Sequence, residues 1–278
     1  MSTKILLLGQ RGKMGTALTR VLTGQHDLIG AGSKDFNAMD TEDVGTLLDK
    51  HRPAVVINTV AFAGIDGCEA EPQAAFQLNT VLPRFLAERS IERGFRLVHF
   101  STDAVFSDRG EGFYTEEDCP APLNIYGLTK YGGDCFVQSI ARDYYILRIS
   151  ILFGPTQKGG QFVEKMLRRI ADGQKQLRIA DDIIASPTYN LDVALRLSRM
   201  LQEEVPSGLY HVVNEGRASL WELMREVAGR LGLDVSVEKA SYKDFPSRAR
   251  KNTCTPLRSV KAEPLRPWRE AVRDCYGG

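Results

Sequence analysis

The chain has 278 residues, of which 43% are hydrophobic and 26% are charged. This is the composition of an ordinary globular protein, and it excludes disorder, collagen and a short peptide-like scaffold. Lys and Arg (36) almost balance Asp and Glu (35), so no general positive field exists to hold nucleic acid, which we do not expect as the main partner.

The five cysteines are widely spaced and odd in number, with no Cys-x-x-Cys pair and no Cys/His spacing suited to zinc. They indicate reduced cytosolic thiols, and we expect no catalytic metal. The apolar run near the N-terminus, Ile5 to Leu8, has only four residues and is far too short for a signal peptide or a membrane span. We therefore expect a cytoplasmic protein that does not bind a membrane.

Strand-like and helix-like segments alternate through the first half of the chain. An apolar run, Lys4–Leu8, ends at Gly9 as a strand buried on both faces would, and a helix pattern starts near Met14. The alternation predicts a doubly wound, Rossmann-like parallel sheet of the α/β class. The further strands are expected at Asp27–Ala31, Ala54–Thr59, Arg96–Ser101 and Tyr144–Ser150, and the helices around Thr41–His51, Pro72–Arg93 and Tyr126–Ala141.

After Phe153-Gly154-Pro155 the alternation loosens into mixed elements. We place a dinucleotide-binding domain at residues 1–154 and a smaller, predominantly substrate-binding mixed α/β domain at residues 155–278. The boundary is approximate, and segments of the two domains are allowed to interleave. In the second part we expect helices at Gln161–Asp172, Asn190–Glu203 and Leu220–Gly232, and strands at Gln176–Ile179 and Tyr210–Val213.

A glycine-rich loop, GQRGKMG, lies between the first predicted strand and the first predicted helix. Its glycines permit a tight turn and a close approach of the backbone to a pyrophosphate, and the helix N-terminus behind it offers unpaired N–H groups. A tight turn without a ligand is the alternative, but the position after the first strand favours a dinucleotide. The expected contacts in this loop are Gly9, Arg11, Gly12, Lys13, Met14 and Gly15.

The end of the second predicted strand decides between NADH and NADPH. An acidic residue there usually holds the ribose hydroxyls of NAD, but this chain reads Gly-Ala-Gly-Ser-Lys. Ser33 and Lys34, with Arg11, could bind a 2′-phosphate, which favours NADPH and leaves NADH possible. The alternative, equally open at this point, is that Lys34 and Arg11 are solvated surface side chains.

A hydroxyl, a phenol and an ammonium form the candidate catalytic group. Thr102 follows a hydrophobic strand, so it lies at the carboxyl end of the sheet, where α/β folds bind ligands. Tyr126 and Lys130 are four residues apart at the start of a helix and so share one face. We expect Lys130 to lower the pKa of Tyr126, which then protonates a carbonyl oxygen. A tyrosine packed along an exposed lysine stem is the alternative for such a pair taken alone.

With these motifs in order, the chain resembles the extended short-chain dehydrogenases, and within them the dTDP-4-dehydrorhamnose reductases. The resemblance implies NAD(P)H-dependent reduction of a 4-keto group on a nucleotide-diphosphate sugar, dTDP-4-dehydro-L-rhamnose in the first place, and it suggests a homodimer. The supporting segments are GQRGKMG at Gly9–Gly15, NTVAFAGIDGCE at Asn58–Glu69, LVHFSTDAVF at Leu97–Phe106, PLNIYGLTKYGGD at Pro122–Asp134, SPTYNLDVA at Ser186–Ala194 and RPWREA at Arg266–Ala271.

The resemblance also implies roles for single residues. Tyr126 would protonate the carbonyl oxygen, and Lys130 would also hold the nicotinamide ribose. Thr102 would hydrogen-bond the reacting carbonyl, with Asp103 beside it as a substrate contact. Ala61 and Phe62 match the segment that lies against the dinucleotide, although Phe62 could equally serve packing alone. Ser101 is interpreted as the end of the strand, and Asn79 matches a helix position by motif only.

Three departures from the family pattern fall on the sugar side. Ala104 stands where the family usually has tyrosine, and Ile151 where it usually has tryptophan, so aromatic stacking area is lost. In the C-terminal segment the family tends to read Arg-Pro-Ser, but here Arg248 and Arg250 belong to a basic loop. This loop could contact a diphosphate or could simply be solvated.

Several rival functions follow from the same residues. A dehydratase is disfavoured because Ala104 follows Asp103, so the second carboxylate that removes water is absent. A reductase or epimerase of another nucleotide-ketosugar stays open, as does a non-catalytic, NADP-binding regulatory subunit. The four histidines are dispersed, and His99 falls within a predicted buried strand, which argues against a metal-dependent hydrolase.

Overall fold

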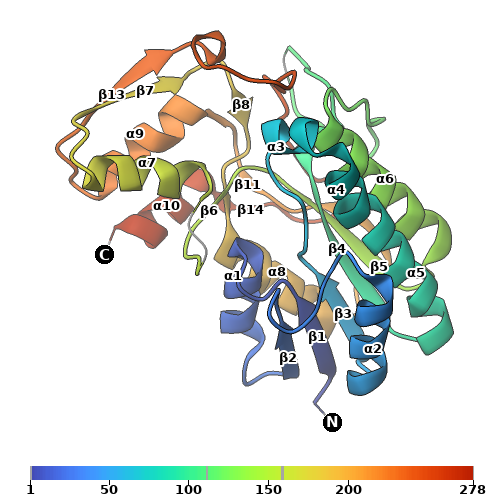
Figure 1. Cartoon of the computed structure of the whole chain (residues 1–278). Coiled ribbons are helices and arrows are strands. Elements are labelled where there is room, and N and C mark those ends of the chain that lie inside the picture. Colours follow the sequence, from blue (N-terminus) through green and yellow to red (C-terminus); the bar gives the residue numbers. More distant parts are fainter. Residues whose placement is uncertain (1, 111, 158–159, 278) are drawn as a thin grey trace.

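A six-stranded sheet forms the centre of the computed structural model, which describes residues 2–110, 112–157 and 160–277 (Figure 1). All neighbouring strands are parallel. The central strands are buried on both faces, as their unbroken apolar sequences require. The predicted doubly wound α/β class is confirmed. In spatial order the strands are β10 (Gly208–His211), β5 (Tyr144–Ile149), β4 (Arg96–Thr102), β3 (Val55–Asn58), β1 (Lys4–Leu8) and β2 (Asp27–Ala31).

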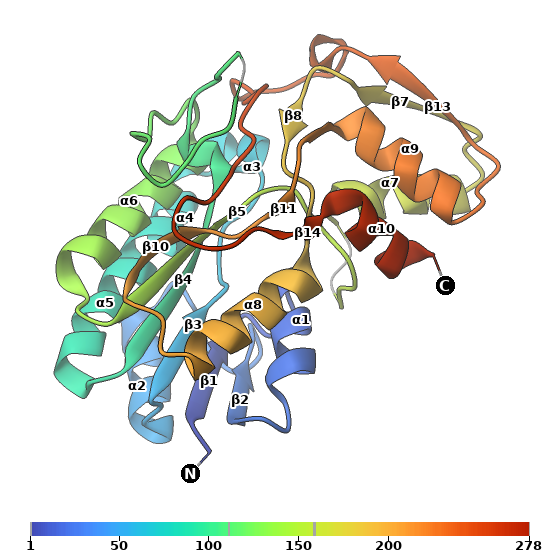
Figure 2. The same ribbon diagram turned by 180° about the vertical axis from the view of Figure 1, so that it is seen from behind.

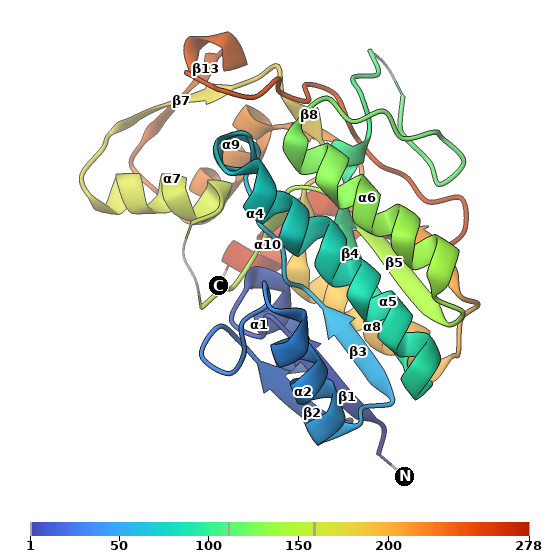
Figure 3. The same cartoon turned by 45° about the vertical axis from the view of Figure 1, so that its right-hand side comes forward.

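Helices cover both faces of this sheet. Two of them, α1 (Lys13–Leu22) and α8 (Asn190–Gln202), pack together over one face, where α8 is seen in Figure 2. Three others lie over the opposite face, as Figure 3 shows. Each turns an apolar stripe inward, so the sheet is sealed between two hydrophobic layers. The three are α2 (Thr41–His51), α5 (Leu82–Arg93) and α6 (Ile125–Ile140).

A smaller lobe stands beyond the carboxyl ends of the main strands (Figure 1). It has its own core, built around Phe153, Leu223 and Trp268. Its elements are α7 (Phe162–Ala171), β7 (Gln176–Ala180), β8 (Ile184–Ala185), β12 (Ala218–Ser219), α9 (Leu220–Arg230), β13 (Ser236–Ala240), η3 (Tyr242–Asp244) and α10 (Trp268–Tyr276), with β6 (Leu152–Phe153), β9 (Thr188–Tyr189), β11 (Asn214–Glu215) and β14 (Leu265–Pro267) between the two lobes.

The chain crosses between the lobes more than once. Residues that follow position 154 return to the main sheet as α8 and as the edge strand β10. The apolar face of α8, with Val193 and Leu197, is part of the main core. The segments of the two expected domains therefore interleave, and no single cut of the chain separates them.

The segment predicted as one helix over Pro72–Arg93 is divided. It comprises α4 (Pro72–Phe76), a π-helical turn η1 (Gln77–Val81) and α5, preceded by a short helix α3 (Ile65–Ala70). Pro83 has no N–H for the carbonyl of Asn79, four residues earlier, and its ring displaces that carbonyl. The π turn leaves Asn79 buried and facing the loop that follows β3.

Candidate active site

A cavity of about 430 Å³ lies at the carboxyl ends of the central strands, where the strand order reverses between β1 and β3. Open α/β sheets bind their ligands at such a reversal. Ser101 and Phe100 at the end of β4 and Leu152, Thr156 and Gln161 beside the smaller lobe complete the wall. Eight of the predicted site residues line this cavity, namely Gly9, Gly12, Lys13, Met14, Ser33, Ala61, Tyr126 and Lys130.

The glycine loop is closed so tightly that two of its glycines cannot be replaced. Gly9 has a φ of +84°, and a Cβ there would lie 2.6 Å from the hydroxyl oxygen of Thr59. A Cβ on Gly15 would lie 2.2 Å from the carbonyl oxygen of Gly9. Gly15 thus lets α1 approach the loop without lining the cavity. The result is a helix N-terminus, begun at Gly12, that presents N–H groups to an anion.

Lys13 lines the cavity, but its ammonium group contacts the smaller lobe. Nζ lies 2.7 Å from Oε1 of Glu164 on α7 and donates to the carbonyl of Leu152 at 3.0 Å. Burial lowers the pKa of Lys13, and the carboxylate of Glu164 opposes that shift. The side chain predicted to bind the cofactor therefore also ties the glycine loop to the second lobe.

The three side chains predicted to recognise a 2′-phosphate lie around the end of β2. Ser33 lines the cavity, while Arg11 and Lys34 are exposed and lie outside its wall. Arg11 nevertheless reaches the loop after β2, since its Cδ is 4.0 Å from the position of a Cβ on Gly32. Asp35 accepts a hydrogen bond from the N–H of Gly32 at 2.8 Å, so its carboxylate is occupied locally.

The loop after β3 is fixed by one buried amide. Asn79 accepts from the N–H of Phe62 at 2.9 Å and donates to its carbonyl at 3.1 Å. Ala61 lines the cavity, whereas Phe62 does not, and its ring packs near Gly67 of α3. The geometry therefore favours the packing role of Phe62. Asn79, matched by motif only, shapes this wall of the cavity.

The hydroxyl of Thr102 lies beside the phenol of Tyr126 and acts on its pKa. Burial raises the pKa of Tyr126 to about 12, the hydroxyl of Thr102 lowers it in part, and the carboxylate of Asp103 raises it further. The expectation that Lys130 lowers this pKa is wrong, because Nζ of Lys130 is turned to the carbonyl of Phe100. A phenol with this pKa stays protonated at neutral pH and can donate its proton.

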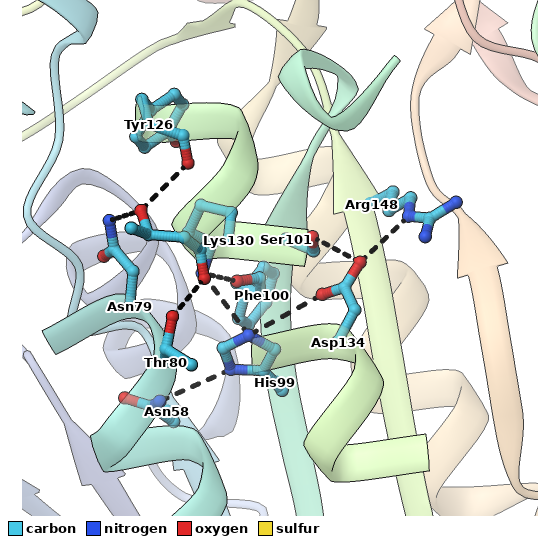
Figure 4. A network of polar contacts seen from close by, with 11 residues as sticks. Asn58, Asn79, Thr80, His99, Phe100, Ser101, Tyr126, Lys130, Asp134 and Arg148 are labelled. Carbon is cyan, nitrogen blue, oxygen red and sulfur yellow. Dashed lines mark hydrogen bonds and ion pairs between the residues drawn. The ribbon is translucent and has the colours of Figure 1, made fainter. Parts of the chain in front are cut away.

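Lys130 lines the cavity and is held by a network of polar contacts, which Figure 4 shows. Its Nζ donates to the carbonyl oxygen of Phe100 at 2.6 Å and lies 3.4 Å from Nε2 of His99. Burial lowers the pKa of Lys130 to about 8, and the carboxylate of Asp134 opposes the shift. Ser101, interpreted from the sequence as the end of the strand, both lines the cavity and donates to Asp134 at 2.9 Å. The spacing of four residues from Lys130 to Asp134 on one helix could have revealed this partner.

Asp103, predicted as a substrate contact, has both carboxylate oxygens hydrogen-bonded within the protein. Ser150 and Thr255 donate to Oδ2 at 2.9 and 2.8 Å, and Thr102 donates to Oδ1 at 3.1 Å. Burial raises the pKa of Asp103. Its clear role is to join the ends of β4 and β5 to the C-terminal segment, next to the short helix η2 (Asp103–Val105).

The basic C-terminal loop is brought to the same edge of the molecule. Oδ1 of Asp66 on α3 accepts from the hydroxyl of Ser247 and from the N–H groups of Arg248 and Ala249. Asn124, the N-cap of α6, donates to the carbonyl of Arg250 at 3.0 Å. The side chains of Arg248 and Arg250 are exposed, and Asn124 precedes Tyr126 by two residues.

The other two departures on the sugar side are Ala104 and Ile151. Ala104 is buried, and its carbonyl oxygen would be only 2.1 Å from a Cβ on Gly127, so η2 and α6 touch through backbone. Ile151 packs against the core of the smaller lobe.

The five cysteines all lie in described segments and are free thiols. Across the described ranges, no cluster of three or more His, Cys, Asp or Glu suits a metal, and the helices are too short or too polar to cross a bilayer.

Comparison with known proteins places this architecture in one family. The model of the RmlD substrate binding domain matches residues 3–277. The dTDP-4-dehydrorhamnose reductase of Streptomyces griseus is 32% identical over 98% of this chain and 92% of its own, and the spore coat polysaccharide biosynthesis protein SpsK of Bacillus subtilis is 31% identical over 98% and 96%. The crystal structure of dTDP-4-dehydrorhamnose reductase from Bacillus anthracis in complex with NADP covers 99% of both chains, with 28% identity and a TM-score of 0.92. The chain therefore belongs to the RmlD substrate binding domain family of extended short-chain dehydrogenases.

Proposed function

We propose that this protein reduces the 4-keto group of a nucleotide-linked deoxysugar with NADPH, with dTDP-4-dehydro-L-rhamnose as the first candidate substrate. The observation that carries the proposal is that Tyr126, with the hydroxyl of Thr102 beside it, lines the same cavity as Lys130 and the glycine loop. As a member of its family the chain is an NAD(P)H-dependent oxidoreductase.

The cavity suits an extended dinucleotide. At one end the N-terminus of α1 can hold a pyrophosphate, and at the other Lys130 can hold the nicotinamide ribose. Ser33 in the wall and Arg11, whose side chain reaches the loop after β2, can hold a 2′-phosphate, which supports NADPH over NADH. When bound, the cofactor supplies the hydride that the carbonyl carbon receives.

The chain's own residues then handle the proton. Thr102 orients the reacting carbonyl, and Tyr126 gives its proton to the carbonyl oxygen. Tyr126 is protonated at neutral pH, which is the form that reduction consumes, although burial also makes the phenol a weaker acid.

The identity of the sugar depends on the smaller lobe. We place the sugar nucleotide between the Thr102–Tyr126 pair and the loop that carries Arg248 and Arg250, so residues 1–154 serve mainly the dinucleotide. Relatives of similar identity are named for other ketosugars, including a dTDP-4-keto-6-deoxy-D-glucose reductase of Streptomyces niveus that is 30% identical. A different dTDP-ketosugar is therefore the second candidate. A homodimer and a cytoplasmic location stay predictions from the sequence.

The test is oxidation of NADPH by the purified protein with a panel of dTDP-4-keto-6-deoxysugars, beginning with dTDP-4-dehydro-L-rhamnose. The Tyr126→Phe variant removes only the proton donor, so we expect turnover to fall by about 10²-fold or more. NADPH affinity, measured by fluorescence titration, should stay within about twofold of wild type, since the substitution leaves the glycine loop and Lys130 in place. Near wild-type turnover in Tyr126→Phe would rule out this assignment of the proton donor.

A further inference from the structure

Two opposite charges are buried beneath the cavity without lining it. Asp134 on α6 is fully buried, and the side chain of Arg148 on β5 is 3% exposed. Nε of Arg148 donates to Oδ2 of Asp134 at 3.1 Å, and the hydroxyl of Ser101 donates to the same oxygen. Figure 4 shows this pair joined through His99 to Lys130. Burying an ion pair is costly, so its place directly under Lys130 calls for a reason.

His99 connects the pair to Lys130 in one defined tautomer. The side-chain oxygen of Asn58 accepts from the N–H of Val60, so the amide nitrogen of Asn58 is the group that faces Nδ1 of His99, at 3.4 Å. Nδ1 then accepts, and the proton of the neutral ring is on Nε2. Burial and the charge of Lys130 hold the pKa of His99 well below its ordinary value, so the ring is neutral.

This tautomer makes the proton of Lys130 easy to lose. Nε2 of His99 lies 3.4 Å from Nζ of Lys130 and 3.9 Å from Oδ1 of Asp134. An ammonium group and a ring N–H that face each other are both donors, whereas a neutral amine can accept from the ring. Oδ1 of Asp134 has no hydrogen-bond partner among the described residues, so this carboxylate acts on Lys130 by charge across the ring.

The charges around Lys130 therefore decide its state. Arg148 is always charged, and Arg148 and Lys130 oppose the rise that burial causes in the pKa of Asp134. The titratable groups that face Lys130 and Tyr126 are His99 of β4, Asp103 of η2 and Cys68 of α3. Those that face Asp134 and Arg148 are Tyr131 and, through it, Cys135 of α6, and His211 of β10. The contacts from β3 and η1 are the neutral side chains of Asn58, Asn79 and Thr80.

We propose that Asp134 and Arg148 are positioning residues that act through Lys130: the balance of their two buried charges sets the pH at which Lys130 loses its proton, and so the upper pH limit of the reaction. The inference rests on the proposed reductase function. Asp134 favours the ammonium form of Lys130, and Arg148, which is paired with Asp134, offsets part of the carboxylate's charge. Removing Asp134 therefore lowers that limit, and removing Arg148 raises it. Removing both leaves the net charge unchanged.

The test is the pH dependence of kcat for wild type and three variants. Asp134→Asn should move the falling, high-pH limb down by about one pH unit, since an opposite charge this close shifts a pKa by that order. Each rate is expressed as a fraction of the same protein's maximal rate. At pH values above both midpoints, this fraction for the variant is then about a tenth of the fraction for wild type. Arg148→Gln should move the limb up by a similar amount, and Asp134→Asn/Arg148→Gln should return it towards wild type.

The matched control is Asp143→Asn, which breaks the ion pair with Arg96 at a half-exposed position at the far end of β5 and should leave the limb unchanged. Thermal unfolding shows which variants are folded. Either single variant is enough to test the proposal, because the shifts of the high-pH limb expected for the two variants have opposite signs. The proposal is overturned if a folded single variant has its high-pH limb at the same pH as wild type, whatever the maximal rate of that variant.

Failure of the proposed function gives a different result. If wild type turns over none of the sugars, the same four proteins are titrated with NADPH across the pH range, because Lys130 lines the cavity and its charge affects binding. The midpoint of NADPH affinity should then shift down in Asp134→Asn and up in Arg148→Gln. Equal midpoints in all four proteins would contradict the coupling independently of any sugar.

Discussion

Two buried lysines, one on each side of the cavity, have opposite surroundings. Lys13 reaches from the glycine loop to the smaller lobe, where a carboxylate lies 2.7 Å from its Nζ. Lys130 lies under the cavity, where Nζ meets a carbonyl oxygen and a histidine ring, and the nearest carboxylate is beyond that ring. Burial lowers the pKa of both.

The different surroundings indicate that burial serves a different role for Lys13 than for Lys130. The close contact with Glu164 opposes the effect of burial on the pKa of Lys13 and joins the two lobes. Lys130 lacks such a contact, and its pKa is lowered to about 8, so its proton can be lost in the working range. We therefore expect Lys13 to serve stability and Lys130 to serve the reaction, and substitutions can separate these two roles.

The largest expected effect is that of Lys130→Met on turnover. Methionine keeps the length of the side chain and removes the charge, so we expect kcat to fall by about 10²-fold or more while the melting temperature is unchanged or slightly raised. The measurement pairs NADPH oxidation with thermal unfolding, and Lys165→Met at an exposed position of α7 is the control. A variant that loses stability but keeps its turnover would reverse the roles assigned to the two lysines.

The next effect is on stability and concerns Glu164→Ala. Removing this carboxylate leaves the buried ammonium of Lys13 with the carbonyl of Leu152, so we expect the free energy of unfolding to fall by about 3 kcal/mol. Urea denaturation measures the loss. The control is Glu88→Ala, which breaks the exposed pair with Arg84 and should cost less than about 0.5 kcal/mol. Equal losses in the two variants would mean that the Lys13 pair does not join the lobes.

The same two lysines show which features can be predicted from the sequence and which cannot. The sheet and the helices α1, α2 and α6 follow from local periodicity, and Lys130 follows from its spacing to Tyr126 on one helix. The partner of Lys13 is 151 residues away, and the bond from Thr255 to Asp103 spans 152 residues. No local pattern encodes such pairs, so the sequence predicts only a cofactor contact for Lys13.

The pKa values could not be predicted for a related reason. The spacing of Tyr126 and Lys130 suggested that the ammonium would lower the pKa of the phenol. The direction of Nζ is instead set by the carbonyl of Phe100 and by His99, which belong to a strand some 30 residues earlier in the chain. Burial then makes the largest contribution to the pKa shifts of both Tyr126 and Lys130, and only the packed structure shows this burial.

The smallest effect concerns a third lysine, whose carboxylate partner is exposed. Nζ of Lys251 lies 3.3 Å from Oδ2 of Asp66, a side chain that is 42% exposed. Hydrogen bonds from Ser247, Arg248 and Ala249, together with Lys251, lower the pKa of Asp66 to about 2 against the opposing effect of burial. Because the pair is exposed and screened, we expect Asp66→Asn to cost less than about 1 kcal/mol of unfolding free energy.

The pH dependence of that small difference identifies its cause. The folded-state pKa of Asp66 is below the ordinary value of 3.8, so its contribution is present above about pH 4 and disappears as the pH falls towards 2. Urea denaturation of wild type and Asp66→Asn at pH 6 and at pH 3 should show the difference shrinking at the lower pH. A small rise in KM for the sugar, with NADPH affinity unchanged, should accompany it, because Asp66 holds the backbone of the loop that carries Arg248. A difference that is constant with pH would mean that the carboxylate charge does not anchor this loop.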